Sequence, residues 1–290
     1  MLVNYSDLNI AFTIENVSFT VLNMAFEEFR RNIPMHSHSA QSYEVHYIAG
    51  GSGKAIINEQ IFELLPNTLY VTGPGVKHEQ LSTPENPMKE YCIYLHTEAM
   101  PRTKKATVAS SFLQTSFWFG NASGNILPIL QQLFEEMQQK HIGYRIIVES
   151  LLRQFLVAVV RCYVAGNRQT GIDNAGRSTV SLDTQRCYII ETYFLFEYTT
   201  ITLHKLAEST GVSTRQLERF LKEQYGKTFL QMKNEARMSA AATLLSTTDK
   251  SITEISMELD YASPDAFSRA FRNFHHVSAR EYRKNYSYIL

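Results

Sequence analysis

The pattern of apolar and polar positions changes character along the chain. Up to about residue 100, short alternating or β-branched runs are separated by Gly, Pro and Asn. Short strands at close spacing with turn residues between them are typical of a small β-sandwich or barrel. The runs that predict strands are Ser18–Phe26, Tyr43–Ile48, Lys54–Ile57, Leu69–Thr72 and Glu90–Leu95.

From about residue 125 the apolar period becomes helical. Apolar residues recur at steps of three and four from Leu127 to Met137 and from Ile146 to Val159. This predicts two helices that form an antiparallel hairpin near Gly143. The helices either cover their own domain or form a dimer interface, and the pattern does not choose. The polar stretch 166–181 then predicts a linker, and 182–290 is helical throughout.

The last ninety residues contain a repeat. Leu217-Glu-Arg-Phe-Leu and Phe267-Ser-Arg-Ala-Phe share one pattern, and positions 217 and 267 lie 50 residues apart. Each copy predicts a short helix, a turn and a second helix, with Gly211 at the first turn and Ser213 and Ser263 as N-caps. This is the helix-turn-helix arrangement, whose second helix enters a DNA major groove.

The exposed side of each second helix carries the residues that we expect to read bases. Arg pairs with guanine, Gln with adenine, and Ser or Thr with bases or phosphates. Residues just before the helix that follows each unit suit phosphate contact. The predicted DNA-binding residues are Thr214, Arg215, Gln216, Glu218, Arg219, Lys222, Asp265, Ser268, Arg269 and Arg272 on the helices, with Lys227, Thr228, Ser278 and Arg280 at phosphates.

The segment from about 201 to 286 resembles the DNA-binding domain of AraC/XylS-type bacterial transcription regulators. The resemblance implies a seven-helix module, double-stranded promoter DNA and RNA polymerase as partners, and activation as the usual mode, with repression as the alternative. The second unit departs from the family where Asp260-Tyr261 replaces Gly-Phe, His276 replaces Gly and Ala279 replaces Pro. The residues that carry the resemblance are Leu206-Ala207, Gly211, Val212-Ser213, Leu217, Arg219, Leu221, Gly226, Arg237, Ala241, Leu244-Leu245, Ile252, Ile255, Phe267-Ser-Arg269, Phe271 and Tyr282-Arg283.

A second set of residues lies in the first half. His36-Ser-His38 on a strand would place both imidazoles on one face, and Glu44 and His78 on neighbouring strands complete a three-His, one-carboxylate set. This half resembles the small cupin barrel that is the sensor domain of many AraC-type regulators. We expect the set to line a polar pocket without a metal or other cofactor; the alternative is a metal site of His36, His38, Glu44 and His78. The expected effector is small and polar, for instance a sugar, and the predicted pocket residues are His36, His38, Tyr43, Glu44, His46, His78, Tyr94 and His96.

Composition narrows the function classes. Lys+Arg and Asp+Glu are both 28, so the net charge is zero, which disfavours a protein that coats nucleic acid without specificity. From His204 to Leu290 the counts are 13 and 10, and this modest excess suits a site-specific DNA reader. Three separated cysteines, no export signal and no apolar run of membrane length predict a soluble cytoplasmic protein.

We therefore expect an α+β multidomain chain without enzymatic activity or catalytic residues. A cupin-like effector-binding barrel would occupy 1–120, a helical hairpin that forms a homodimer 121–165, the linker 166–181, and an all-α double helix-turn-helix domain 182–290. Two alternatives stay open: a metal-dependent cupin enzyme and a metal-sensing regulator.

Overall fold

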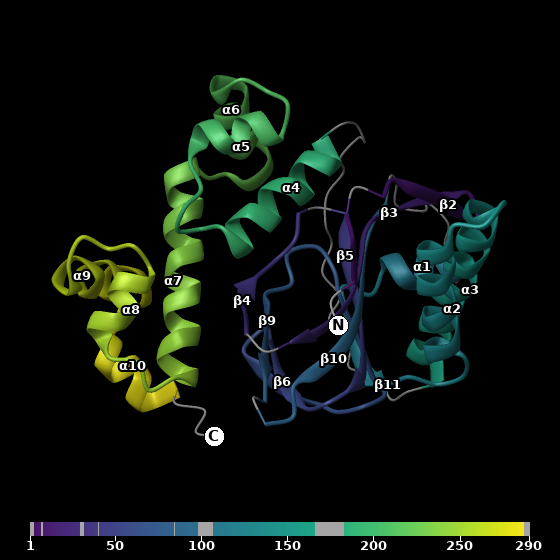
Figure 1. Cartoon of the computed structure of the whole chain (residues 1–290), viewed down its shortest axis with the longest axis horizontal. Coiled ribbons are helices and arrows are strands. Elements are labelled where there is room, and N and C mark those ends of the chain that lie inside the picture. Colours follow the sequence, from purple (N-terminus) through teal and green to yellow (C-terminus); the bar gives the residue numbers. More distant parts are fainter. Residues whose placement is uncertain are drawn as a thin grey trace. The chain divides into compact units, whose positions relative to one another are not determined.

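A computed structural model describes residues 3–6, 8–29, 32–39, 41–83, 85–97, 107–165 and 183–286. The chain divides into two compact units (Figure 1). The first, here called the β unit, comprises residues 1–31 and 37–185. The second, the helical unit, comprises 32–36 and 186–290. The predicted linker 166–181 lies outside the described residues.

The strands form two sheets. A seven-stranded sheet has the order β1-β3-β10-β5-β8-β11, with β2 paired to β3, and a four-stranded sheet has the order β4-β9-β6-β7. The central pairs β3–β10, β10–β5 and β5–β8 are antiparallel. The strands are β1 (Val3–Tyr5), β2 (Ile10–Ile14), β3 (Val17–Phe29), β4 (Ile33–His36), β5 (Ser42–Gly50), β6 (Gly53–Ile57), β7 (Gln60–Leu64), β8 (Thr68–Thr72), β9 (His78–Ser82), β10 (Met88–Thr97) and β11 (Phe117–Asn121).

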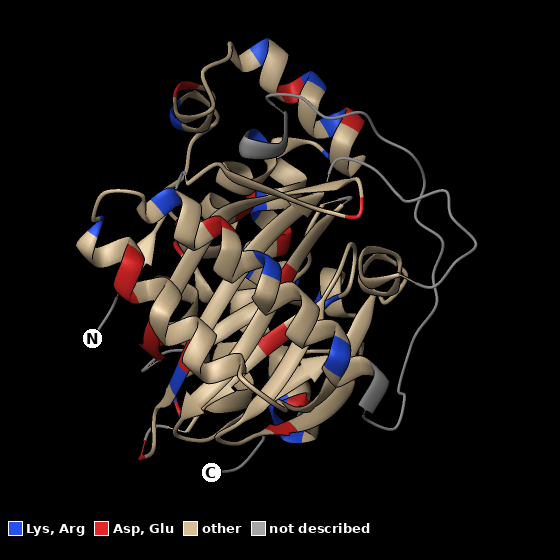
Figure 2. Cartoon of the chain, turned by 90° about the vertical axis from the view of Figure 1, so that its right-hand side faces the viewer, with Lys and Arg blue, Asp and Glu red and all other residues tan. Residues whose placement is uncertain are grey.

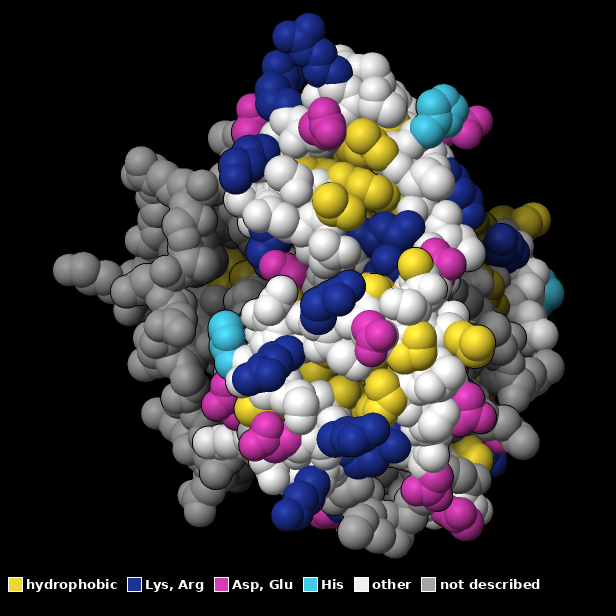
Figure 3. Space-filling model, turned by 90° about the vertical axis from the view of Figure 1, so that its left-hand side faces the viewer, with side chains coloured by type: hydrophobic (Ala, Val, Ile, Leu, Met, Phe, Trp, Pro, Cys, Tyr) yellow, Lys and Arg dark blue, Asp and Glu magenta, His cyan; other side chains and the backbone are white. Residues whose placement is uncertain are grey.

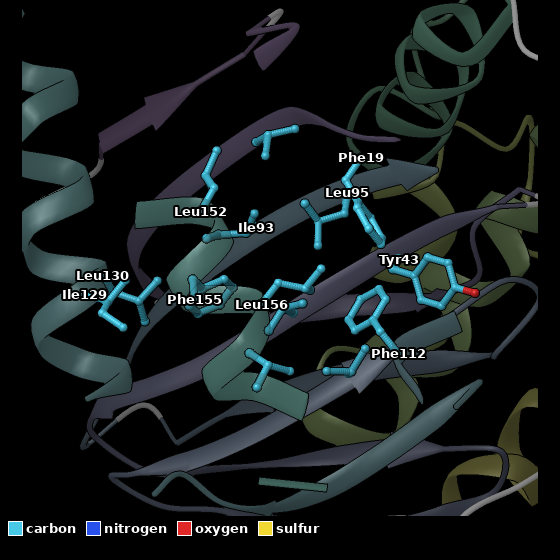
Figure 4. Packing of buried hydrophobic residues seen from close by; sticks show 14 of the residues in the cluster. Phe19, Tyr43, Ile93, Leu95, Phe112, Ile129, Leu130, Leu152, Phe155 and Leu156 are labelled. Atoms are coloured by element: carbon cyan, nitrogen blue, oxygen red, sulfur yellow. The ribbon is translucent and has the colours of Figure 1, made fainter. Parts of the chain in front are cut away.

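The hydrophobic core of the β unit lies on one face of the larger sheet. Side chains alternate between the two faces of a strand, so Tyr43, Val45 and Tyr47 on β5 share a face with Ile93 on β10. Three helices pack against this face (Figure 4). They are α1 (Val108–Leu113), α2 (Ile126–Gln139) and α3 (Tyr144–Ala165). The opposite face of the same strands is polar.

Helices α2 and α3 form the predicted hairpin. Lys140, at the end of α2, and Gly143, just before α3, both have left-handed backbone, which ends one helix and turns the chain into the next. Phe155, which is buried, packs in the core cluster with Leu152 and Leu156 (Figure 4). Figure 2 shows acidic and basic residues interspersed along the ribbon of the β unit on the side where α2 and α3 lie. The expectation of two helices joined near residue 143 is confirmed.

The helical unit contains seven helices in the described residues. Ser, Thr and Pro define most helix starts: Ser213, Thr228 and Ser251 each form a capping box, and Ser263 caps α9 with Pro264 at the first helical position. The helices are α4 (Asp183–Phe196), α5 (Leu203–Ser209), α6 (Thr214–Tyr225), α7 (Phe229–Thr247), α8 (Ile252–Glu258), α9 (Pro264–His275) and α10 (Ala279–Tyr286).

The repeat in this unit is larger than the sequence pattern indicates, because each copy has three helices. Ile190 on α4 and Ala241 on α7 are buried and lie 51 positions apart, as do Phe194 and Leu245. Helices α4–α6 enclose one core together with the first half of α7, and the second half of α7 encloses another with α8–α10. Figure 1 shows α5 and α6 near one end of α7, and α8, α9 and α10 toward its other end. Each recognition helix thus has its own small core.

The predicted fold class, a β-rich first part and a helical second part with two helix-turn-helix units, is confirmed. None of the described helices is both long enough and apolar enough to cross a membrane.

Candidate functional site

The predicted base-reading residues lie on α6 and α9. Leu217 and Leu221 bury one side of α6, and Phe267 and Phe271 bury the equivalent side of α9. Residues three and four apart lie on one face of a helix, so the buried side of each helix also includes Phe220 or Ala270, and the other side faces solvent. Thr214, Arg215, Gln216, Glu218, Arg219 and Lys222 on α6, and Asp265, Arg269 and Arg272 on α9, are exposed, whereas Ser268 is half-buried.

Several of these side chains already have partners within their own helix. The Gln216 side-chain oxygen accepts hydrogen bonds from the backbone N–H and the hydroxyl of Ser213, as part of the capping box. Lys222 Nζ donates to the carbonyl of Gly226 at 3.0 Å, and Arg219 pairs with Glu223 at 3.6 Å. In the described part of the chain, no ion pair holds Arg215 on α6 or Arg269 on α9.

The predicted phosphate-contacting residues lie at helix N-termini. The hydroxyl of Thr228 caps α7, and that of Ser278 accepts from the backbone N–H of Glu281 at 3.2 Å. The N–H groups at a helix N-terminus carry partial positive charge and favour phosphate. Arg280 is exposed in the first turn of α10. Lys227 Nζ pairs with Glu235 at 2.6 Å, so a phosphate at this site has to compete with a carboxylate.

On the face shown in Figure 3, charged groups do not form one continuous basic surface. Figure 3, which faces the side of α8 and α9 in Figure 1, shows Lys and Arg at separated positions with Asp, Glu and apolar groups between them. A face with mixed charges attracts DNA weakly without regard to sequence. We therefore expect the DNA affinity to depend on individual side-chain contacts to bases and phosphates.

The turn of the second helix-turn-helix unit is held by an arginine from α7. Asp260 has φ of 57°, the left-handed region that favours glycine. Arg237 Nη2 donates to the backbone oxygen of Asp260 and lies 3.3 Å from its carboxylate, and the guanidinium lies 4.7 Å from the ring centre of Tyr261. In the first unit, Arg186 of α4 donates to the Thr210 carbonyl at 3.2 Å. The departures from Gly-Phe are therefore compensated by contacts to α7.

A polar cluster occupies the other face of the large sheet. Glu44 Oε2 lies 2.9 Å from Nε2 of His38 and 3.2 Å from Nε2 of both His46 and His78. The three imidazoles are buried, and the Glu44 side chain is 16% exposed. His36 ends β4 in the helical unit, where its Nδ1 lies 2.8 Å from the carbonyl oxygen of Pro34. Within the β unit, the structure brings together four of the eight predicted pocket residues: His38, Glu44, His46 and His78.

The remaining predicted pocket residues take different positions. The ring of Tyr94 meets that of His38 edge-on at 5.0 Å, so Tyr94 adjoins the cluster. His96 is buried on β10 opposite Ser42, two residues farther along the strand from Tyr94. The prediction for Tyr43 is not supported: its ring packs on Phe112 in the helix-side core, and its hydroxyl donates to the Leu113 carbonyl at 3.2 Å. Tyr43 and Glu44 are consecutive, so they face opposite sides of β5.

Four residues that the sequence analysis missed lie beside His46. Glu90 Oε1 is 2.8 Å from His46 Nδ1 and accepts a hydrogen bond of 2.8 Å from Gln80, which also donates to the Tyr70 hydroxyl. The ring of Tyr70 stacks on His46 with 4.3 Å between centres, and Cys92 lies opposite His46 in the strand pairing. Alternation along β10, where Glu90, Cys92 and Tyr94 share a face, is the signal that identifies two of the four.

Burial changes the proton affinities in this cluster. Desolvation raises the pKa of the Cys92 thiol to about 12 and raises that of the Tyr70 hydroxyl, so both groups are neutral near pH 7. Desolvation by itself would lower the pKa of His46, but its polar surroundings, which include the Glu90 carboxylate, outweigh desolvation and raise this pKa well above 6.5. The cluster therefore favours a positive charge near His46.

Comparison with known proteins agrees with both parts. Residues 25–156 match the family model of the AraC-like ligand-binding domain, and residues 206–285 match a helix-turn-helix domain. The HTH-type transcriptional regulator ArgR of Pseudomonas aeruginosa is 37% identical over 83 residues, which are 29% of this chain and 25% of that protein. An HTH-type regulator of Haemophilus influenzae is 25% identical over 163 residues, which are 56% of this chain and 53% of that one.

Among solved structures, an AraC-type transcriptional regulator from Chromobacterium violaceum is 33% identical with a TM-score of 0.30, and the match covers 30% of this chain and 79% of that one. The chain spans about half or less of the length of the two curated relatives. A ligand-binding β unit followed by two helix-turn-helix units defines a class of two-domain regulators. Within that class, the chain belongs to the AraC-type family of transcription regulators.

Proposed function

We propose that the protein is a sequence-specific DNA-binding transcription regulator whose DNA affinity is controlled by a small polar effector in the β unit. The observation that carries this proposal is the duplicated three-helix unit, in which α6 and α9 each expose two arginines over a separate buried core. One helix that exposes two arginines is common on protein surfaces and does not by itself indicate DNA binding. Two copies on one unit match two successive major-groove faces of one duplex.

The length of α7 supports this arrangement. Its 19 residues span about 28 Å at 1.5 Å per residue, and one turn of B-DNA is about 34 Å. A rigid helix that lies in the chain between α6 and α9 therefore suits two recognition helices that enter neighbouring turns of the major groove. Thr228 and Ser278, which cap the helices after the two units, are placed to direct backbone N–H groups toward phosphate.

The polar face of the β unit supports control by a bound effector. Glu90 Oε2 and the Thr72 hydroxyl are buried atoms without a hydrogen-bond partner in the described part of the chain. A buried polar atom without a partner is unfavourable, and a bound ligand with donors and acceptors would satisfy it. An effector changes DNA binding only as far as its affinity differs between two arrangements of the protein.

The helical hairpin supports the proposal of a homodimer. Ile142, just before α3, is fully exposed, and Ile146 and Ile147 in the first turn of α3 are exposed as well. Neighbouring exposed apolar residues are a common feature of protein–protein contacts. A homodimer through residues 125–164 would place four recognition helices on one DNA site. Promoter-bound RNA polymerase is the partner that a transcription activator requires.

The test is footprinting of the full-length protein on the DNA that flanks its own gene. The wild type should protect a site, and Arg215→Ala and Arg269→Ala should each weaken binding by about 1–3 kcal/mol and relax the base preference in one half of it. Lys89→Ala, which removes an exposed positive charge from β10, is the matched control and should bind as the wild type does. Absence of salt-dependent binding to any such fragment, with or without added ligands, would contradict the proposal.

A further inference from the structure

The two recognition helices can be compared position by position, because the repeat fixes their alignment at both ends. Ser213 and Ser263 cap the starts of α6 and α9, and Gly226 and His276 end these helices in left-handed backbone. Both pairs keep the 50-residue offset of the repeat, as do the buried residues between them. Residues that lie 50 positions apart therefore take equivalent places over their own cores.

One exposed position is identical in the two helices, and another has the opposite charge. Arg219 on α6 is equivalent to Arg269 on α9, whereas Arg215 is equivalent to Asp265. All four side chains are exposed. Residues four apart lie on one face of a helix, so each of these arginines shares a face with the first-turn residue before it. The first turn therefore presents a guanidinium in one unit and a carboxylate in the other.

Contacts within the helices leave these two first-turn side chains available to a duplex. The neighbouring Gln216 side chain is engaged in the capping box with Ser213. Arg215 and Asp265 hold no ion pair in the described part of the chain, although Arg269 lies one turn after Asp265. Recognition helices contact base edges with residues near their N-terminus, which is where both side chains lie.

The chemistry of the two groups selects different bases. A guanidinium donates to O6 and N7 of guanine, whereas a carboxylate only accepts and suits the N4 amino group of cytosine. The amino group of adenine is a poorer partner for a carboxylate, because the N7 acceptor beside it repels the second oxygen. A carboxylate near phosphates is also repelled unless a donor faces it. Asp265 therefore disfavours sites that lack such a donor.

We propose that Arg215 reads a guanine and Asp265 reads a cytosine at the equivalent positions of the two half-sites. The inference rests on the proposed function and deepens it, because it names the base that each unit selects. Two identical recognition helices would select the same base at this position of each half-site. Two helices with opposite first-turn charge need two different half-sites, so the full site has a direction and α6 and α9 are not interchangeable on it.

The experiment selects binding sites from a pool of random DNA duplexes with the purified full-length protein. The variants are Arg215→Ala, Asp265→Asn and Asp265→Arg, and the position at which a variant loses its preference identifies the base that its helix contacts. Glu208→Gln and Glu208→Arg are the matched controls, because they change the net charge as the Asp265 variants do, at an exposed residue of α5. Thermal unfolding of each variant shows whether it folds.

We expect the wild type and both Glu208 variants to select a guanine in one half-site and a cytosine in the other. Arg215→Ala should lower the discrimination in favour of the guanine by about 5–150-fold and keep the cytosine preference. Asp265→Asn should lose the cytosine preference alone. Asp265→Arg should replace that preference with one for guanine, which would make the two half-sites alike at this position.

An unchanged cytosine preference in Asp265→Asn would overturn the inference, as would selection of the same base at both positions by the wild type. A lowered melting temperature of the Asp265 variants, with binding to all sequences weakened by one factor, would also overturn it, because the carboxylate would then only stabilise the start of α9. If the selection enriches no sequence at all, the proposed function fails as well. If it enriches a site without these two base preferences, only the inference fails.

Discussion

The contact between Arg237 and the second helix-turn-helix turn gives a quantitative prediction. Its guanidinium donates to the Asp260 backbone oxygen, lies 3.3 Å from the Asp260 carboxylate and rests on Tyr261. The carboxylate is 77% exposed, so the ion pair itself is worth about 0–1 kcal/mol. The hydrogen bond from a charged donor contributes about 1.5–3 kcal/mol, and the cation–π contact about 0.5–1 kcal/mol.

Arg237→Met should therefore lower the stability of α8 and α9 by about 2–4 kcal/mol. Asp260→Asn removes only the exposed ion pair and keeps the backbone oxygen in a residue that tolerates left-handed backbone, so it should cost no more than about 1 kcal/mol. Arg186→Met is the control in the first unit, where it should affect α5 and α6 but not α8 and α9. Amide hydrogen exchange of the full chain resolves these segments separately.

Equal losses for Arg237→Met and Asp260→Asn would refute this reasoning, because they would make the exposed ion pair the main contribution. A loss spread evenly over α4–α10 would also refute it, since it would show that the two three-helix units unfold as one. The same variants link stability to recognition. Footprints of Arg237→Met should weaken first in the half-site read by α9.

Three further predictions concern the helical unit. Gly226 and His276 end α6 and α9 in left-handed backbone, and no atom lies within 4 Å of a Cβ at Gly226, so Gly226→Ala should destabilise by about 1–2 kcal/mol and His276→Gly should stabilise, as measured by thermal unfolding. Burial lowers the pKa of His275 in the folded protein, so on acidification the unfolded chain binds a proton at a higher pH than the folded one. The contribution of His275 to stability should be full above pH 6.5 and fall below it. Denaturant titrations of His275→Gln should lack this contribution. Phe267→Ala, at a fully buried position, should cost about 3–5 kcal/mol, and unchanged hydrogen exchange in α9 would contradict that.

The helical unit was largely predictable from sequence because its rules are local. Caps, left-handed turns and a fixed repeat of apolar positions are all set within one or two turns of helix. The inclusion of α4 and α7 in the repeat was missed, because their equivalence appears only in burial and in the turn contacts of Arg186 and Arg237. Those contacts join residues more than 20 positions apart, and no local pattern specifies them.

The candidate site in the β unit was predictable only in part. Spacing identified His36, His38, Glu44 and His78, but pairing between strands decides which neighbours join them. Glu90, Gln80 and Tyr70 complete the surroundings of His46 from three different strands. Tyr43 shows the opposite error, because a polar aromatic residue beside Glu44 in sequence lies on the other face of the strand.

The two faces of β5 suggest how a bound effector is sensed beyond its own site. Glu44 and His46 face the polar cluster, while Tyr43 and Val45 between them pack in the core that includes α1 and α3. A shift of β5 that improves the contacts of Glu44 must also move Tyr43 against Phe112 and the Leu113 carbonyl. Close-packed cores respond to such shifts by changing between discrete arrangements rather than by deforming smoothly. Tyr43 would therefore couple the proposed effector site to the helices, because it follows Ser42 and precedes Glu44 on β5 and packs on the helix side of that strand.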